Sequence, residues 1–149
     1  MAYLLGIDIG TSGTKTVLFQ QDGKPVASHI SDYLMDQPFN GWAEQNPDDW
    51  WQAVVAGIRG VLQQSGVTAD LIRGIGLSGQ MHGAVVLDEK GEVLRPAILW
   101  CDQRTGEECR IMTETVGRDT LVRITGNPAL LPPLVTRTPI ITPSSPNAK

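Results

Sequence analysis

The chain has 149 residues, two cysteines and a formal net charge of −4, and this length fits a single domain with its own core. The two cysteines form no CxxC or Cys/His cluster, which excludes a disulfide framework and a zinc site and favours a reducing compartment. An acidic chain without a basic cluster, a signal peptide or an apolar run of roughly 18 residues is expected to be cytoplasmic and to bind a small molecule, not nucleic acid or a membrane.

Three short strands are predicted in the first thirty residues. An apolar run over residues 3–9 ends at a turn bounded by Gly10 and Gly13, and residues 15–20 then alternate apolar and polar. A second turn, with the Asp22-Gly23 hairpin signal, leads into residues 25–30. The pattern predicts an antiparallel strand meander.

A long helix should follow. Asn46 is a suitable N-cap, Pro47 fits the first helical position, and two acids in the first turn favour the positive end of the helix dipole. Apolar residues then recur at three- and four-residue steps until Ser65-Gly66. We expect the helix to begin at Pro47, and we expect Trp50 and Trp51 to anchor it to the sheet.

Further short elements complete the pattern. In chain order they are a strand over 71–77, a glycine-flanked break at 78–83, a strand resuming over 84–87, a turn at 88–91, a short apolar strand over 96–100 and a helix from Gln103 to about Val116. A meander followed by a helix and further strands indicates an α/β domain.

Charge and proline are distributed unevenly along the chain. All 16 acidic residues lie at or before Asp119, where the running net charge is −7, and the last thirty residues carry +3. Six of the ten prolines lie after Gly126, the last glycine. We therefore expect a packed domain over residues 1–130 and a Pro/Thr/Ser-rich, disordered tail over residues 131–149.

The turn after the first strand carries groups suited to phosphate. Asp8 ends a buried strand, and the glycine turn behind it holds Thr11, Ser12 and, shortly after, Lys15. Such a turn can direct backbone N–H groups and hydroxyls at phosphate oxygens while the carboxylate holds a magnesium ion. It matches neither the P-loop nor the dinucleotide-binding fingerprint. An ordinary hairpin capped by Asp8 is the alternative.

Four motifs in one order make the signal more specific. The DIGTSGTK turn is followed by GWAEQNPDDWW, LSGQMHG and RPAILWCDQR. This combination resembles the FGGY family of carbohydrate kinases, most closely its xylulokinase members. The resemblance implies an incomplete N-terminal lobe of the ribonuclease-H-like fold of actin and hexokinase. It also implies ATP-dependent phosphorylation of D-xylulose to xylulose 5-phosphate in pentose metabolism, with Mg²⁺.

The resemblance also implies roles for residues on the phosphate side. Asp8 matches the family's first-strand aspartate, which helps to place the metal and the phosphates, and Thr11, Ser12 and Lys15 belong to the hairpin that faces the phosphates. A carboxylate-bound Mg²⁺, a hydroxyl and a cation suit phosphoryl transfer, which depends mainly on charge stabilisation.

On the sugar side the resemblance implies substrate contacts for Gln80, Met81, His82, Trp100 and Asp102. An amide, a flat thioether and an imidazole at a strand end could meet the hydroxyls and the C–H faces of a polyol. A satisfied core histidine, a core methionine and, for Asp102, an N-cap of the following helix are the alternatives.

Trp42 precedes the long helix, together with Glu44 and Gln45, in a loop that lies near the sugar cleft in this family. Its side chain could stack on a carbohydrate or serve as a hydrophobic staple for the helix, and the sequence favours neither. Cys101 and Cys109 are interpreted as bystanders.

In the family, the catalytic base and the adenine-binding lobe lie beyond residue 149. We therefore expect this chain to be inactive alone, and the change near residue 130 suggests a frameshift or a truncation. A homodimer is one possible assembly of the full-length enzyme. A sugar-binding remnant and an actin- or chaperone-type nucleotidase lobe are the alternative functions.

Overall fold

The computed structural model describes residues 2–129 as two compact units, divided between Trp100 and Cys101, and each is described by itself. The predicted tail at 131–149 lies outside the described residues, so the boundary at residue 130 stays a prediction. Within the described part, no helix is both long and apolar enough to cross a membrane.

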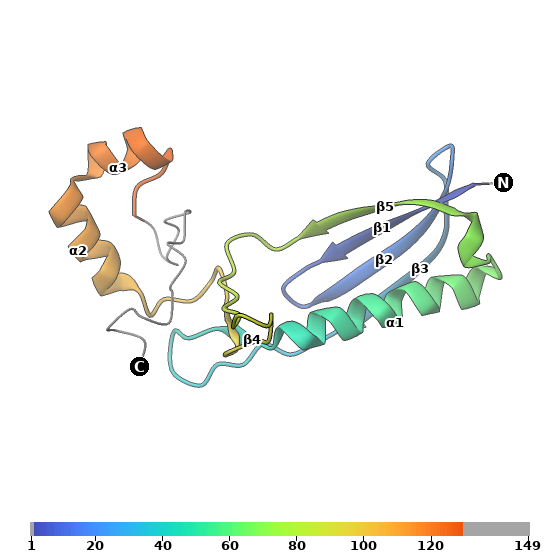
Figure 1. Ribbon diagram of the computed structural model, residues 1–149, viewed down its shortest axis with the longest axis horizontal. Helices are drawn as coiled ribbons and strands as arrows, with labels where there is room; N and C mark the ends of the chain where they lie inside the picture. Colours follow the sequence, from blue (N-terminus) through green and yellow to red (C-terminus); the bar gives the residue numbers. More distant parts are fainter. Residues whose placement is uncertain (1, 130–149) are drawn as a thin grey trace. The chain divides into compact units, whose positions relative to one another are not determined.

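The first unit is built on a four-stranded sheet of order β3-β2-β1-β5 (Figure 1). Its strands are β1 Tyr3–Ile9, β2 Gly13–Gln20, β3 Pro25–Asp32 and β5 Ile72–Gly79. β1 pairs with β2 and β2 with β3 in antiparallel fashion, whereas β5 lies parallel to β1. The predicted antiparallel meander is therefore confirmed.

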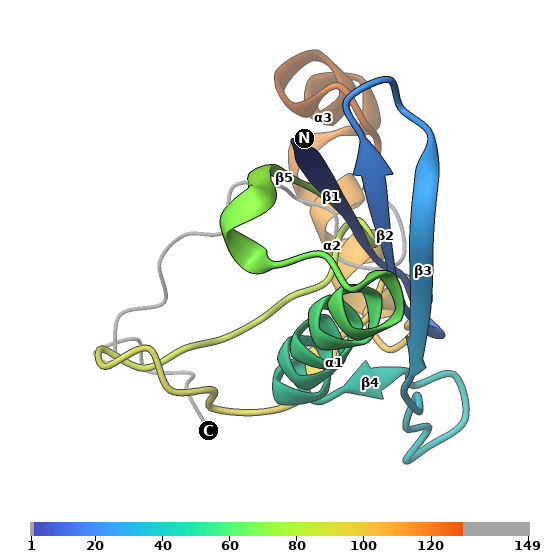
Figure 2. The same ribbon diagram turned by 90° about the vertical axis from the view of Figure 1, so that its right-hand side faces the viewer.

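Alternate residues of the two central strands form the buried face of this sheet, because successive side chains of a strand point to opposite faces. Helix α1, Pro47–Ser65, runs across that face (Figure 2). The opposite face carries Asp8 and Lys15, and both side chains are exposed. The buried side chains are Tyr3, Leu5 and Ile7 of β1 and Thr14, Thr16 and Leu18 of β2.

Both predicted ends of α1 are confirmed. The side chain of Asn46 accepts a hydrogen bond from the backbone N–H of Asp48 at 3.1 Å, and Pro47 occupies the first turn. At the other end Gly66 adopts the left-handed conformation with φ 67°, and its N–H donates to the carbonyl of Leu62. Local capping chemistry therefore determines where this helix begins and ends.

The prediction that both tryptophans anchor α1 is wrong for Trp51, whose side chain is 64% exposed. Trp50 is half-buried, and its indole Nε1 donates to Gln45 Oε1 at 3.0 Å. Consecutive helical residues do not share a face, so only one of the two rings can turn towards the sheet.

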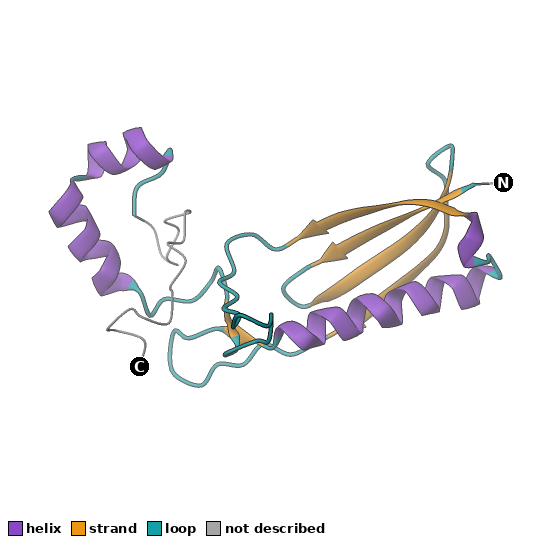
Figure 3. Ribbon diagram, viewed as in Figure 1, coloured by secondary structure: helices purple, strands orange, loops and turns teal. Residues whose placement is uncertain are grey.

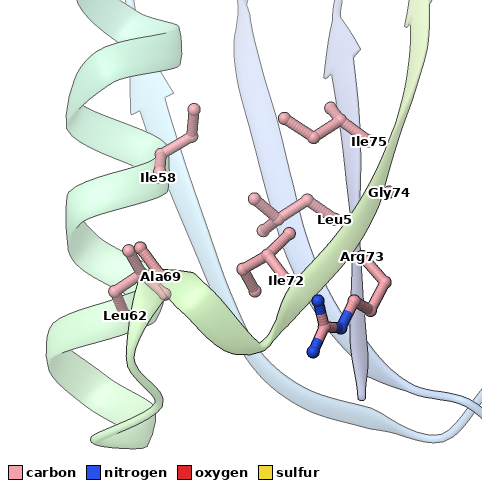
Figure 4. Close-up of a pocket in the computed structure, with 8 residues that line it drawn as sticks. All are labelled: Leu5, Ile58, Leu62, Ala69, Ile72, Arg73, Gly74 and Ile75. Atoms are coloured by element: carbon pink, nitrogen blue, oxygen red, sulfur yellow. The ribbon is translucent and has the colours of Figure 1, made fainter.

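A short 3₁₀ helix, η1 Ala69–Leu71, leads from α1 into β5. An apolar groove lies between α1 and the first half of β5 (Figure 4). The candidate residues Gln80, Met81 and His82 follow the other end of β5, so this groove is not the candidate site. Its lining residues are Leu5, Ile58, Leu62, Ala69, Ile72, Arg73, Gly74 and Ile75.

The segment after β5 is less regular than predicted. The strand expected over 84–87 is wrong, since only isolated bridges occur there, Ala84 with Ile98 and Leu87 with Val93. Val85 and Val86 are exposed, and an apolar run that no second layer buries makes a poor strand. The turn at 88–91 is confirmed, with Asp88 Oδ1 accepting from the N–H groups of Lys90 and Glu92 at 2.8 Å.

Two very short strands form a separate antiparallel pair, β4 Glu44–Gln45 with β6 Ala97–Ile98. The apolar strand expected over 96–100 is thus only two residues long, and its partner β4 was not predicted. An ion pair between Arg95 Nη2 and Glu44 Oε1, 2.6 Å apart, supports this pairing. The pair brings the end of the first unit beside the segment that precedes α1.

The described part of the second unit contains two helices, α2 Gly106–Val116 and α3 Arg118–Thr125 (Figure 3). α2 ends where predicted but begins three residues later than Gln103, after a loop formed by Asp102 and Arg104. Helix α3 was not predicted, because eight residues are too short for a helical period to be recognised. Gly117, with φ 86°, separates the two helices.

Candidate active site

The carboxyl ends of β1 and β5 meet at one edge of the sheet, because the two strands are parallel neighbours. Asp8 lies beside Ser78 and Ile9 beside Gly79 in the strand register. The backbone N–H of Gln80 continues this pairing by donating to the carbonyl of Ile9 at 2.8 Å. The turn after β1 and the Gln80-Met81-His82 segment after β5 are therefore neighbours.

The turn between β1 and β2 is hydrogen-bonded to Tyr33, a residue that was not among the predicted site residues. The phenol of Tyr33 donates to the carbonyl of Gly10 and accepts from the hydroxyl of Thr14 at 3.4 Å. Burial raises the pKa of Tyr33 above its ordinary value, against the hydrogen bond from Thr14, and the charge of Asp8 adds to the increase. Tyr33 therefore stays neutral and keeps its hydrogen for the Gly10 carbonyl.

Two charges of the predicted phosphate side lie on the exposed face of the sheet. Asp8 in β1 and Lys15 in β2 are register partners, and both side chains lie on the face opposite α1. Ser12 is exposed at the turn between them. A carboxylate, an ammonium and a hydroxyl are thus presented together at the strand end.

A chain of side-chain hydrogen bonds joins the turn to the β5 end. The hydroxyl of Thr11 donates to Gln80 Oε1 at 3.1 Å and accepts from the indole Nε1 of Trp100 at 3.0 Å. Three predicted site residues from three distant segments, Thr11, Gln80 and Trp100, are therefore in direct contact. The predicted roles of these residues toward substrate stay predictions.

Gln45 completes this chain, although it was not among the predicted site residues. Its side chain is 1% exposed, and its Oε1 accepts from Gln80 Nε2 at 3.1 Å and from Trp50 Nε1 at 3.0 Å. Its Nε2 donates to the carbonyl of Thr11 at 2.7 Å and to that of Leu34 at 3.2 Å. The available signal was its place in the GWAEQNP motif, directly before the helix N-cap.

Met81 and His82 follow Gln80 in an exposed loop. Met81 is 52% exposed and His82 is also exposed, so neither is the core residue that the alternative interpretation assumed. His82 has a φ of 63°, the one positive value at a non-glycine position in the described chain. Such a conformation costs of order 1–3 kcal/mol and is concentrated at functional sites.

Trp42 packs edge-on against Phe39, with ring centroids 4.8 Å apart and an interplanar angle of 70°. This partner was not predicted. Carbohydrate stacking and the staple role both stay predictions for Trp42.

Asp102 belongs to the second unit and forms an ion pair with Arg104. Its side chain is fully buried, Oδ2 lies 2.6 Å from Arg104 Nη2, and Oδ1 accepts from the backbone N–H of Arg104 at 2.9 Å. The N-cap residue of α2 is Thr105, so the alternative role of Asp102 as the helix N-cap is wrong. A sugar contact for Asp102 stays a prediction.

The described residues hold no group of three or more His, Cys, Asp or Glu side chains that could bind a metal on their own. Mg²⁺ bound with nucleotides usually takes one or two carboxylates, water and phosphate oxygens. The single exposed carboxylate of Asp8 fits that limited role.

Comparison with protein families gives one match, the N-terminal domain of the FGGY family of carbohydrate kinases, over residues 3–136. The match extends six residues past the predicted boundary at 130. It covers all the candidate residues of both units.

Similar proteins include the xylulose kinase of Bacillus subtilis, 47% identical over 130 residues that make up 87% of this chain and 26% of the relative. Among solved structures, the xylulose kinase of Rhodospirillum rubrum has a TM-score of 0.79 at 29% identity, over 86% of this chain and 26% of that one. A gluconate kinase from Lactobacillus acidophilus has a TM-score of 0.77 at 31% identity, over 84% and 25%.

The chain spans about a quarter of the length of the relatives that it matches. The solved structures confirm the expected fold class, a partial N-terminal lobe of the actin- and hexokinase-type kinase fold with a mixed sheet. The chain therefore belongs to the FGGY family of carbohydrate kinases and matches the model of its N-terminal domain over residues 3–136.

Proposed function

We propose that this chain supplies the sugar-binding loop after β5 and the phosphate-facing β1–β2 hairpin of an ATP-dependent kinase that converts D-xylulose to xylulose 5-phosphate. The observation that carries the proposal is the hydrogen bond between Thr11 and Gln80, 3.1 Å long. This bond joins the turn after β1 to the loop after β5. One edge of the sheet therefore presents the phosphate-binding candidates and the sugar-binding candidates side by side.

On the phosphate side, Lys15 and the backbone amides of the turn would neutralise and orient phosphate oxygens of ATP. Asp8 is the residue that would hold Mg²⁺ together with those oxygens. When bound, the ion would offset negative charge on the transferring phosphoryl group. Ser12, exposed at the turn, would add a hydroxyl hydrogen bond.

On the sugar side, Gln80, His82 and Trp100 would supply polar groups and ring edges, and the exposed thioether of Met81 would cover a C–H face. The strained backbone of His82, with φ 63°, supports a role in which the loop conformation is itself needed. Similarity to relatives called xylulose kinases supports D-xylulose as the substrate.

The resemblance assigns the catalytic base and the adenine-binding lobe to the part of the relatives that this chain does not span. We therefore expect no measurable turnover from the 149-residue chain alone. Closure of two lobes around the substrates, and removal of the proton from the sugar hydroxyl, would depend on that part of the relatives.

A chimaera tests the proposal. Residues 3–136 of this chain replace the matching segment of the Bacillus subtilis xylulose kinase, and ADP release is measured with D-xylulose, D-gluconate and glycerol. We expect activity on D-xylulose above that on the other two. A chimaera that melts cooperatively but is inactive on D-xylulose, or prefers another polyol, contradicts the proposal.

A matched variant makes the test specific to this chain. Lys15→Met in the chimaera should raise the KM for ATP, whereas Lys24→Met, at an exposed residue of the turn between β2 and β3, should leave it unchanged. An equal effect of both substitutions would contradict the phosphate role of the β1–β2 turn.

A further inference from the structure

We propose that Gln45 is a positioning residue that sets the orientation of the Gln80 amide and ties it to the phosphate-side turn. The inference rests on the proposed function, because it concerns how Gln80 is presented to the sugar. Gln45 lies in the short strand β4, and its side chain is 1% exposed. Its four contacts come from segments before and after it in the chain.

The orientation of the Gln45 amide has a single solution. A glutamine amide offers two N–H hydrogens and two carbonyl lone pairs. The carbonyls of Thr11 and Leu34 can only accept, and they lie 2.7 and 3.2 Å from Nε2. The Trp50 indole can only donate, and it lies 3.0 Å from Oε1. Both ends of the amide are therefore assigned by partners that have no alternative.

The Gln80 amide is then assigned by Gln45. Because Gln45 Oε1 only accepts, Gln80 must turn its Nε2 towards it, at 3.1 Å. Gln80 Oε1 consequently faces the Thr11 hydroxyl at 3.1 Å, and that hydroxyl must donate its hydrogen there. The indole of Trp100 donates to the same hydroxyl oxygen at 3.0 Å, which is consistent with this direction.

Two consequences follow for the site. Gln80 keeps one N–H hydrogen outside this chain of hydrogen bonds, so it presents a donor to a sugar oxygen. The single hydroxyl hydrogen of Thr11 is already used, so Thr11 would serve phosphate through its backbone N–H and not through its hydroxyl. Without Gln45, the Gln80 amide could turn over and present an acceptor instead.

Gln45→Glu is the informative variant because its effect depends on pH. A neutral carboxyl group has one hydrogen, so it can donate to the Thr11 carbonyl and accept from Trp50 and Gln80, and only the longer bond to the Leu34 carbonyl is lost. An ionised carboxylate can only accept, and it would place negative charge against two carbonyl oxygens. Burial beside those oxygens should raise the pKa of the introduced carboxyl group.

The groups that contact this position do not themselves titrate in the neutral range; they are the Thr11 and Leu34 carbonyls, the Trp50 indole and the Gln80 amide. Titratable side chains on the segments around it are Glu44, which pairs with Arg95 at 2.6 Å, Asp48 and Asp49 in the first turn of α1, Tyr33 and Asp36 on either side of the Leu34-Met35 pair, and His82 beyond Gln80. Gln52→Glu, at an exposed position of α1, adds the same charge without the contacts and is the matched control.

The first measurement uses the full 149-residue chain without ligand. In Gln45→Glu, the Trp50 indole N–H and the Gln80 side-chain amide resonances should shift together between about pH 5.5 and about pH 8, as the introduced group titrates. The unsubstituted chain and Gln52→Glu should show no such titration. Resonances that do not respond in Gln45→Glu would overturn the proposed connection.

The second measurement uses the chimaera. At about pH 8, Gln45→Glu should raise the KM for D-xylulose about tenfold, with recovery towards the unsubstituted value at about pH 5.5. Gln45→Met, of similar size, should lose affinity at both pH values. A Gln45→Glu chimaera with an unchanged KM, or with a loss independent of pH, overturns the positioning role. If the resonances titrate but the folded unsubstituted chimaera does not act on D-xylulose, the proposed function fails instead, and the sugar role of Gln45 fails with it.

Discussion

The contact between α1 and β2 leaves no room for a side chain at Gly57. An added Cβ at Gly57 would lie 2.2 Å from Thr16 Oγ1 and 3.0 Å from Thr16 Cβ. Ordinary contact begins at 3.4 Å, so the helix would have to move by about an ångström. Thr16 is fully buried and β-branched, and its side chain cannot turn away.

Gly57→Ala therefore tests two opposing effects. Alanine stabilises a helix interior by about 1 kcal/mol relative to glycine, whereas overpacking a core costs about 1–3 kcal/mol. Because the overlap is large and the neighbour is rigid, we expect the free energy of unfolding to fall by about 1–2 kcal/mol. Urea denaturation of the 149-residue chain, followed by circular dichroism, measures this change.

A double-mutant cycle identifies the cause. Thr16→Ala removes the Oγ1 atom, which has no hydrogen-bond partner in the described part of the chain, and should recover at least half of the loss in the Gly57→Ala background. Gly60→Ala is the comparison variant: its added Cβ would also lie within 3.0 Å of a neighbour, the His29 ring, but that half-buried side chain can change its rotamer, so we expect a smaller loss. A Gly57→Ala chain as stable as the unsubstituted one would refute the packing argument.

Three further predictions concern the turn, the loop after β5 and the second unit. Since the pKa of Tyr33 is raised in the folded state, its contribution to stability is present below about pH 10 and is lost above that pH. The difference in unfolding free energy between the unsubstituted chain and Tyr33→Phe, measured by urea titration, should therefore narrow above that pH. A constant difference would contradict this. Asparagine tolerates a positive φ, so His82→Asn should keep the melting temperature of the chimaera while it raises the KM for D-xylulose. His82→Val should lower the melting temperature. Equal melting temperatures of the two variants would argue against backbone strain. Burial and the charge of Glu108 raise the pKa of Cys109. In a Cys101→Ser chain at about pH 8, iodoacetamide should therefore modify Cys109 more slowly than free cysteine, and Glu108→Gln should make this modification faster. A rate equal to that of free cysteine would contradict the raised pKa.

Local chemistry explains what could be predicted of the fold. Asn46, Pro47 and Gly66 determine the ends of α1 through bonds to backbone groups within four residues, so the sequence is sufficient. The Asp22-Gly23 turn, the apolar run of β1 and the alternation in β2 are equally local, and they produced the correct meander. The strand expected over 84–87 failed because its apolar residues stay exposed in the described part of the chain, so burial does not favour an extended pairing there.

The candidate site divides in the same way. Thr11, Gln80 and Trp100 could be selected from motifs, and the structure brings them into contact. Gln45 could be placed only in the loop near the sugar cleft, and Tyr33 was not selected, because the roles of a buried amide and a buried phenol depend on partners many residues away.

The sequence by itself therefore determined the helix caps, the turns, the strand meander and the family, because these depend on neighbouring residues and on the order of motifs. Only the tertiary structure decided that Trp51 is exposed, that Thr16 faces Gly57, and that the Gln80 amide has one orientation. The physical reason is that burial and hydrogen-bond direction depend on which distant groups arrive at the same place, and β1 and β5 bring those groups together only when they pair.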